Sequence, residues 1–351
     1  MQPTVSFVHL YIVRKPTLIL YFLLIFSAFS YARQPANDSV IVFLDKSLAI
    51  LQANAINRDS VDWTALRATV YEKAASAQNY EEAAKVFPYI FEQIGDHHGA
   101  LRIGKKSYDW NSGFSYQNNA VKEAVKTWKK VSVKLLKGNI GYVLLPGNND
   151  FSGKNIDIDA KEIRAALASL KSKKIKGWIL DLRVNTGGSM YQMLAGLSPI
   201  LGEGKLGSFI NQHGKNDGSW IIRNGNIYLD SNKVSNLPET PVNRKKSLPL
   251  AVLISGMTAS SGEVVAISTI GRKNAVLIGE PTAGYTTANE GFKINAVAGL
   301  NLAVDYDGDR NGKIYSTKVT PVITIDGGDN FADPALDLKV ISASKWINGK
   351  H

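Results

Sequence analysis

The sequence predicts an α/β fold in which buried strands alternate with helices. Two segments, 175–201 and 248–270, share one order: an apolar run, a turn containing glycine, and apolar residues at helical spacing. A third observation is the helical periodicity of residues 38–100, which precedes the first predicted strand. Repeated strand–turn–helix units indicate parallel strand pairing, so we expect a core of βαβ units preceded by helices.

The first part of the mature chain, residues 33–108, is expected to form an N-terminal helical subdomain. Apolar side chains recur on one face from Val40 to Leu51, and a further helix is expected over Glu81–Ile94. That helix should end at Gly95, because glycine favours helix ends.

Residues 109–351 are expected to form the α/β core, with the polar segment 202–247 as an insertion. Within the insertion, two short runs around Trp220 and Tyr228 predict a hairpin. The remaining elements are expected, in chain order, as a strand at 139–146, a helix at 157–171, a strand at 175–182, helices at 190–201 and from Ser260, strands at 275–278, 292–304 and 313–325, and a final helix at 333–346.

Composition narrows the class of protein. The 351 residues are 44% hydrophobic and 20% charged, as in ordinary globular proteins. No cysteine is present, which excludes a disulfide framework, a thiolate metal site and a catalytic thiol. The formal net charge is +11, but the lysines are scattered and no basic stripe with interleaved aromatic residues occurs. We therefore expect no nucleic-acid partner.

The N-terminus has the pattern of a secretory signal peptide. Arg14 and Lys15 precede an apolar run at 18–29, and Ser30-Tyr31-Ala32 offers a small-residue cleavage site. An uncleaved membrane anchor is the alternative, but the run is shorter than the roughly 20 apolar residues that a span needs. We expect residues 1–32 to be removed and the mature chain to be exported, to the periplasm or the extracellular space, with no stable membrane span.

Ser260 lies where the buried strand at 248–254 gives way to a helix. At such a junction free backbone N–H groups and the positive helix end lie beside the serine, an arrangement that suits a nucleophile. The alternative is structural: Thr258 or Ser260 caps the helix, with Glu263 as the capping-box partner.

A serine nucleophile needs a base, and the chain has only five histidines. His9 belongs to the predicted signal peptide, His351 is the last residue, and His213 lies in the polar insertion. His97 and His98 follow Asp96 in a loop at a helix end. They could cap that helix or form half of a metal site, but no ligand cluster with metal-binding spacing accompanies them.

Four motifs in order carry a resemblance to a known family. Gly95-Asp96-His97-His98-Gly99, KGWILDLRVNTGG, TASSGE and LIGEPTAGY resemble the C-terminal processing (tail-specific) serine peptidases. The resemblance runs from about Val40 to Trp346. It implies a ClpP/crotonase-like core, hydrolysis of peptide bonds in a protein or peptide substrate, and no metal or organic cofactor.

The resemblance also assigns roles to individual residues. It implies that Ser260 is the nucleophile and that Gly187, Gly188 and the N–H group of Ser261 form the oxyanion hole. The last of these agrees with the position of Ser261 at a helix start.

Two departures from the family pattern change the implied mechanism. Members with a Ser-Lys dyad carry lysine where this chain has Tyr285, and a tyrosine with an ordinary pKa near 10 cannot simply replace lysine as base. The PDZ module of many members is also absent, because the strand at Gly141 follows His98 too closely to admit a domain of about 50 residues. Both features resemble the tricorn-core-like branch, which implies His98 as base.

An acidic residue near the C-terminus would orient His98 in that branch. The candidates are Asp305, Asp307 and Asp309, and Asp309 is favoured here. The same loop allows two other interpretations: a polar hairpin turn, or the first half of a calcium loop, although Lys318 stands where a calcium loop needs glutamate.

We therefore expect an exported serine peptidase that works through an acyl-enzyme, with Ser260, His98 and Asp309 as its catalytic residues. The alternative is a ligand- or peptide-binding protein on the same scaffold without catalytic activity.

Overall fold

The computed structural model describes residues 36–110, 116–148, 153–170, 174–239 and 248–349, and residues 35–351 form one compact unit. The predicted signal peptide lies outside the described residues, as do His9 and His351. Among the helices of the described ranges, none has the length and apolar character needed to cross a membrane.

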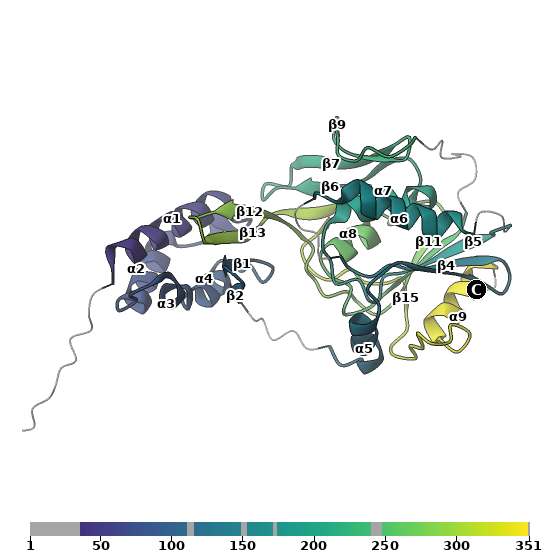
Figure 1. Cartoon of the computed structure of the whole chain (residues 1–351), viewed down its shortest axis with the longest axis horizontal. Coiled ribbons are helices and arrows are strands. Elements are labelled where there is room, and N and C mark those ends of the chain that lie inside the picture. The colour runs from purple at the N-terminus through teal and green to yellow at the C-terminus, as the bar shows by residue number, and fades with distance from the viewer. Residues whose placement is uncertain (1–35, 111–115, 149–152, 171–173, 240–247, 350–351) are drawn as a thin grey trace, which may run out of the picture. The chain divides into compact units, whose positions relative to one another are not determined.

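A run of helices opens the described chain, and strands interspersed with helices follow it (Figure 1). The helical elements are α1 (Asp38–Asn54), η1 (Arg58–Ser60), α2 (Trp63–Ala74), α3 (Tyr80–Ala84), α4 (Phe87–Gln93), α5 (Asn119–Thr127), α6 (Ile156–Ala168), α7 (Met190–Leu201), α8 (Ser261–Ile267) and α9 (Leu338–Ile347). The strands are β1 (Ala100–Ile103), β2 (Lys106–Asp109), β3 (Ser132–Leu136), β4 (Ile140–Leu144), β5 (Gly177–Asp181), β6 (Gly204–Ile210), β7 (Asn216–Arg223), β8 (Asn226–Leu229), β9 (Asn232–Lys233), β10 (Leu250–Ile254), β11 (Ala275–Gly279), β12 (Thr287–Lys293), β13 (Ala298–Asp309), β14 (Ile314–Tyr315) and β15 (Ile323–Thr324).

A six-stranded sheet forms the centre of the core, in the order β15-β11-β10-β5-β4-β3. Its neighbouring strands are parallel except for the antiparallel β3–β4 pair. Strands β4 and β10 are buried along their whole length, as expected for parallel strands covered on both faces. The predicted α/β class and the N-terminal helical region are confirmed.

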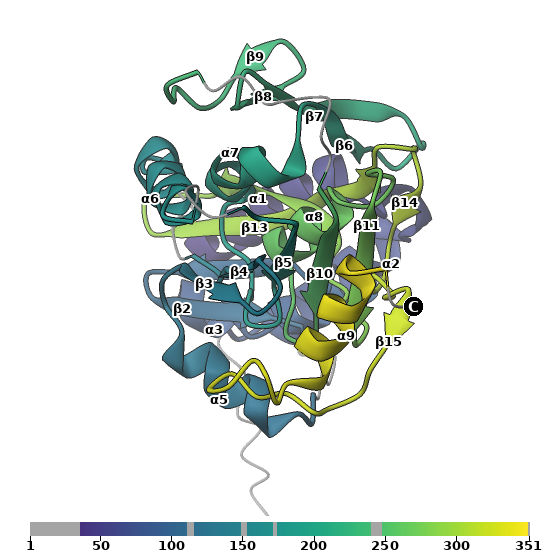
Figure 2. The ribbon, with the colours of Figure 1, turned by 90° about the vertical axis from the view of Figure 1, so that its right-hand side faces the viewer.

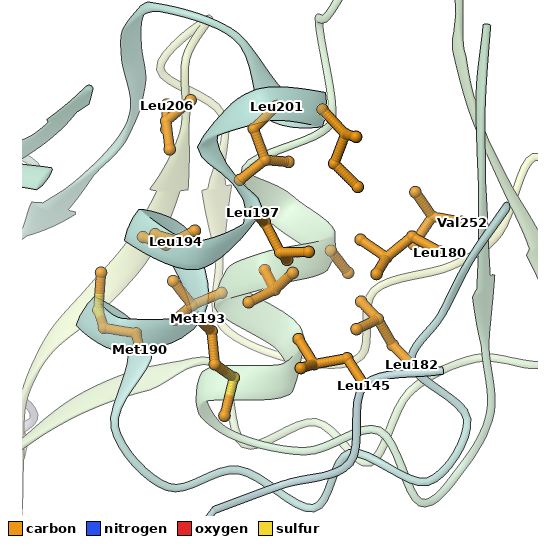
Figure 3. Packing of buried hydrophobic residues seen from close by; sticks show 14 of the residues in the cluster. Leu145, Leu180, Leu182, Met190, Met193, Leu194, Leu197, Leu201, Leu206 and Val252 are labelled. Atoms are coloured by element: carbon orange, nitrogen blue, oxygen red, sulfur yellow. The ribbon is translucent and has the colours of Figure 1, made fainter. Parts of the chain in front are cut away.

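Helices cover both faces of this sheet. On one face, α6, α7 and α8 pack their apolar side chains against the strands, and Figure 3 shows Leu197 of α7 directed towards Leu180 and Val252. On the other face, α9 packs across β5 and β10, in yellow in Figure 2, and contributes Val340 to the cluster.

A second sheet is built on the long strand β13. Its order is β2-β1-β13-β6-β7-β8-β9, and β12 and β14 also pair with β13. The hairpin predicted within 202–247 is present as the antiparallel pair β7–β8. The start of β13 packs with α1, α3 and α4 in a separate apolar cluster, whereas its end pairs with β6.

The predicted strands at 292–304 and 313–325 differ from the observed ones. A turn interrupts the first, because the Asn295 side chain accepts hydrogen bonds from the N–H groups of Val297 and Ala298. The second contains only the short strands β14 and β15. Between them, Val319 exchanges hydrogen bonds with Thr282 instead of joining a ladder.

A buried ion cluster lies at the carboxyl ends of β5 and β11. The guanidinium of Arg183 pairs with Asp181 at 2.5 Å, Asp329 at 2.6 Å and Asp337 at 2.7 Å. The ammonium of Lys339 pairs with Asp329 at 2.8 Å and with a fourth carboxylate, Glu280, at 2.9 Å. The cluster therefore joins the segment before α9 to the turn after β5.

We predict that Leu194→Ala lowers the free energy of unfolding by about 2–5 kcal/mol, because it leaves a cavity under α7. Leu336→Ala is the matched control, since its side chain is 65% exposed and its truncation opens no cavity. Denaturant unfolding of both variants measures the difference. Equal losses for the two variants would contradict the packing described here.

Candidate active site

Three turns meet at the carboxyl edge of the parallel sheet, where α/β proteins bind their ligands. They follow β5, β10 and β11, and hydrogen bonds join them. The Thr258 hydroxyl donates to the Leu182 carbonyl oxygen at 2.9 Å. The N–H group of Ala259 donates to the Asn185 carbonyl oxygen at 3.0 Å. The N–H group of Ala283 donates to the Thr258 carbonyl oxygen at 2.9 Å. The turn that carries Ser260 is thus held from both sides.

Ser260 occupies a strained backbone conformation, with φ 52° and ψ −123°. A residue other than glycine pays about 1–3 kcal/mol for such a position, and serine nucleophiles on sharp strand-to-helix turns adopt it. Helix α8 begins at Ser261, so the N–H group of Ser261 has no acceptor within the helix.

Glu263 holds this strained turn in place. Its carboxylate accepts from the Ser260 N–H group at 2.9 Å, the Thr282 hydroxyl at 2.5 Å and the Gly284 N–H group at 2.9 Å. Burial raises the pKa of Glu263 to about 7, although these hydrogen bonds act in the opposite direction. The predicted pairing of Glu263 with the start of the helix is therefore present, through the backbone N–H group of Ser260.

The glycine turn after β5 lies directly against Ser260. A Cβ atom on Gly187 would lie 2.9 Å from the Ser260 Cβ, and one on Gly188 would lie 2.1 Å from the Asn148 carbonyl oxygen. Both glycines have positive φ, 104° and 123°, which glycine tolerates best. The Ser261 hydroxyl donates to the Gly188 carbonyl oxygen at 2.8 Å. Only glycine therefore fits at either position.

The two glycines differ in their N–H groups. That of Gly187 donates to Asn185 Oδ1 at 3.1 Å. That of Gly188 has no acceptor among the described residues. The free N–H groups beside Ser260 are therefore those of Gly188 and Ser261, and Gly187 supplies the close approach.

His98 is held by a buried carboxylate beside it. Asp96 Oδ1 accepts from the N–H groups of His98 at 2.9 Å and Gly99 at 2.7 Å, while Oδ2 accepts from Ala303 of β13 at 3.0 Å. Burial raises the pKa of Asp96, against the effect of these bonds. Asp96 thus attaches the histidine loop to β13.

The ring of His98 bonds to β12. Its Nδ1 lies 2.8 Å from the Thr287 hydroxyl, and that hydroxyl donates to Asn289 Oδ1 at 3.2 Å. The Asn289 amide is oriented by donation of its Nδ2 to the His98 carbonyl oxygen at 3.0 Å. Because a hydroxyl has one proton, Nδ1 of His98 must be the donor to Thr287, which leaves Nε2 unprotonated.

The environment of His98 keeps the imidazole neutral. Burial lowers the pKa of His98 to about 4, and the neighbouring His97 lowers it further, whereas the contact with Thr287 acts in the opposite direction. A neutral imidazole with a free Nε2 can accept a proton.

His97 and Tyr285 are the two other residues of interest in these loops. His97 Nε2 lies 2.9 Å from the Gly284 carbonyl oxygen. The ring of Tyr285 packs at 5.1 Å from both histidine rings, edge-on to that of His98. Burial raises the pKa of Tyr285, so its hydroxyl remains protonated at neutral pH. The residue at the position of the family's lysine is therefore a packing partner of His98.

Asp309 does not contact His98. Its Oδ1 accepts from the N–H groups of Asn311 and Lys313, and its Oδ2 accepts from the Tyr315 hydroxyl at 3.1 Å. These bonds form the turn between β13 and β14, which agrees with the hairpin-turn interpretation. Within the described ranges, no group of three or more His, Cys, Asp or Glu side chains could hold a metal ion. The group that orients His98 is Thr287, which the sequence did not single out.

Ser260 and His98 line the same cavity, which has a volume of about 650 Å³. Gly188, Ser261 and Thr287 lie in its wall as well. In the part of the chain that the structure describes, no hydrogen bond joins His98 to Ser260. Four of the predicted site residues, Ser260, His98, Gly188 and Ser261, thus line one cavity, whereas Gly187 and Asp309 are not part of its lining.

Comparison with models of protein families shows which family the chain belongs to. Residues 139–325 match the model of Peptidase family S41. The chain belongs to peptidase family S41. This match includes β4 to β15, and therefore the turn that carries Ser260 and the glycine turn beside it. It confirms the family resemblance that the four sequence motifs indicate.

Known relatives of this S41 family member are moderately similar. The nisin-resistance protein of Lactococcus lactis subsp. lactis is 29% identical over 263 residues, which cover 73% of this chain and 74% of the relative. The carboxy-terminal processing protease CtpA of Bacillus subtilis is 30% identical over 168 residues, 48% of this chain and 29% of that protein. The chain thus spans less than a third of the second relative's length.

Solved structures show that the fold is shared. A lipoprotein from Streptococcus agalactiae superposes with a TM-score of 0.67 at 23% identity, covering 89% of this chain and 97% of the other. The photosystem II D1 C-terminal processing protease gives a TM-score of 0.54 at 15% identity, covering 83% and 94%.

We predict that Glu263→Gln removes part of the pH dependence of stability. The pKa of Glu263 is raised from 4.5 to about 7, so the folded state binds more protons than the unfolded state between these values. Its contribution should therefore lower the stability of the wild type as pH rises through that window, by about 3 kcal/mol. Denaturant unfolding across the window measures the slope.

Glu92→Gln is the control for Glu263→Gln, because Glu92 is an exposed glutamate on α4. It should reproduce the wild-type slope. The same steepness in Glu263→Gln as in the wild type would mean that Glu263 is ionised throughout the window.

Proposed function

We propose that this member of family S41 is a serine peptidase in which Ser260 is the nucleophile and His98 the general base. One observation carries the proposal. A strained serine at the start of α8 shares a cavity with a partly buried histidine whose Nε2 is free to accept a proton. Strain at a serine beside unpaired N–H groups is typical of activated nucleophiles.

The chemistry is acyl transfer. The Oγ atom of Ser260 attacks the peptide carbonyl carbon while its proton passes to Nε2 of His98. The N–H groups of Gly188 and Ser261 stabilise the negative charge that develops on the carbonyl oxygen. His98 then gives its proton to the departing amine as the C–N bond breaks. Water, activated by the same nitrogen, hydrolyses the acyl-enzyme.

Thr287 takes the place of an acidic residue in this mechanism. Its hydroxyl accepts from Nδ1 of His98, and its own proton is committed to Asn289. The pair thus selects the tautomer and fixes the ring, as an aspartate does in serine peptidases, but it places no negative charge beside the imidazole. A neutral partner suits the low pKa of His98.

No hydrogen bond between His98 and Ser260 is present, so the pair must draw closer when substrate binds. Catalytic hydrogen bonds are often long in unliganded sites and tighten in the complex. The same observation, with Tyr285 in place of the family's lysine, favours the second function: a protein that binds peptides on this scaffold without cleaving them.

Export of the mature chain is part of the proposal. It rests on the signal-peptide pattern of residues 1–32. A peptide is the proposed substrate class, and nisin is one reasonable test substrate because a relative with 29% identity carries that name.

We predict that a fluorophosphonate probe labels the wild-type protein at Ser260. Labelling should be lost in Ser260→Ala and should fall by about 10²-fold or more in His98→Ala, because a general base contributes about that factor. Mass spectrometry of the labelled peptide identifies the site.

Ser268→Ala is the matched control for the labelling experiment, because Ser268 is a buried serine at the other end of α8, with its hydroxyl bonded to the Val265 carbonyl oxygen. It should retain labelling. A folded wild-type protein that the probe leaves unlabelled would establish the binding function in place of the peptidase.

A second prediction concerns pH and Thr287. Because burial lowers the pKa of His98 to about 4, kcat/KM should rise with pH through about 4 and level off well below the ordinary histidine pKa of 6.5. Thr287→Val should lower the plateau by about 10–100-fold, since the ring loses its orienting bond. Peptide hydrolysis measured across this range tests both statements.

The adjacent Thr286→Val is the control, because the Thr286 hydroxyl donates to the Thr317 carbonyl oxygen and makes no contact with His98. An acid limb near 6.5 in the wild type, or equal plateaus for the two valine variants, would contradict the proposed role of Thr287.

A further inference from the structure

One buried carboxyl group in the cavity wall is not used by the mechanism above. Asp307 lies on β13 and lines the same cavity as Ser260 and His98. Its side chain is completely buried, and neither carboxyl oxygen has a hydrogen-bond partner. Buried polar groups are almost always paired, so an unpaired carboxyl beside a nucleophile calls for an explanation.

The strand pairings show that Asp307 is held rigidly. Its N–H group donates to the Thr286 carbonyl oxygen at 3.1 Å, and β13 pairs it with Phe209 of β6 on one side and Tyr315 of β14 on the other. The position of the carboxyl is therefore set by three strands. Rigid placement is what a residue that selects substrate requires.

The surroundings of Asp307 favour a positively charged ligand group. Glu263 and Asp305 act on Asp307 in the same direction as burial, so the pKa of Asp307 is well above its ordinary value. Among the charged side chains of the cavity wall, Arg102 is exposed and His98 is neutral at neutral pH. The negative charges of Glu263 and Asp305 would repel a substrate carboxylate at this position and attract a cation.

The cavity wall also suits the stem of a long basic side chain. Phe209, Val264 and Leu300 line it together with Asp307. Lysine and arginine place their methylene groups along apolar surface and carry the charge at the tip. An ammonium offers three donors and a guanidinium five, which can satisfy both unpaired oxygens of Asp307.

We propose that Asp307 is a specificity-determining residue that receives the lysine or arginine side chain of a substrate residue near the scissile bond. This inference rests on the proposed peptidase function, because its first test measures peptide cleavage. In the empty cavity the carboxyl group keeps its proton, because an unpaired buried charge is costly. When the basic side chain enters, that proton is released to solvent and the carboxylate pairs with the cation.

The experiment uses a set of peptides in which one lysine moves along an otherwise uncharged sequence, each matched by a peptide with norleucine in its place. Norleucine keeps the stem and removes the charge. For the wild type, we expect kcat/KM to favour lysine over norleucine by about tenfold or more at one position relative to the cleaved bond. Asp307→Asn should reduce that ratio to about one.

Asp305→Asn is the matched control, because it removes a carboxylate from the same strand that does not line the cavity. It should retain most of the lysine preference. Thermal unfolding of Asp307→Asn, and of Asp307→Leu as a second variant, verifies that the fold is kept. Leucine leaves no buried polar group unpaired, so this variant should unfold at the wild-type temperature or above it and still lack the preference.

Binding of the same peptides to Ser260→Ala, measured by calorimetry, separates this inference from the peptidase function. Tighter binding of lysine peptides, lost in Ser260→Ala/Asp307→Asn, supports the inference even when the wild type cleaves nothing. A preference for lysine that survives Asp307→Asn, a preference for glutamate, or equal binding of lysine and norleucine at every position would overturn it.

Discussion

The buried pairing of Arg183 with Asp181, Asp329 and Asp337 is the constraint on which the rest of the site depends. Arg183 begins the turn that presents Gly187 and Gly188, and its carbonyl oxygen accepts from the Ser255 hydroxyl at 2.7 Å, at the start of the turn that presents Ser260. Loss of one partner of a buried ion pair costs about 3–5 kcal/mol, because the other charge stays buried.

This arrangement explains how separate parts of the chain converge on one cavity. The parallel sheet delivers the proposed nucleophile and the proposed oxyanion donors from adjacent strands, β10 and β5. The proposed base, His98, comes from the N-terminal helical region, and Asp96 attaches its loop to β13 through Ala303. Because β12 pairs with the same strand, Thr287 is brought to the ring of His98. Strand β13 therefore positions both His98 and Thr287.

Much of this site could be predicted from the sequence, and the limits have physical reasons. Ser260 and the paired glycines follow buried strands, so local pattern alone placed them at one sheet edge. The scarcity of histidine singled out His98.

The residue that orients His98 could not be predicted in this way, because it depends on the register between β12 and β13, which shifts between Ala288 and Asn289. A carboxylate near the C-terminus was the natural candidate, yet the Asp309 carboxylate forms a local turn. The predicted strand at 292–304 was also wrong as one continuous strand, because the Asn295 side chain forms a turn within it.

The contact between His98 and Thr287 joins residues 189 positions apart. Such long-range contacts form slowly, because the chain must close a large loop before they contribute stability. A chain that has folded only around Ser260 therefore holds the proposed nucleophile without its proposed base. Under the proposed mechanism, hydrolytic activity begins only after the β12–β13 pair has closed against the histidine loop, so a newly made chain is inert towards other unfolded polypeptides around it.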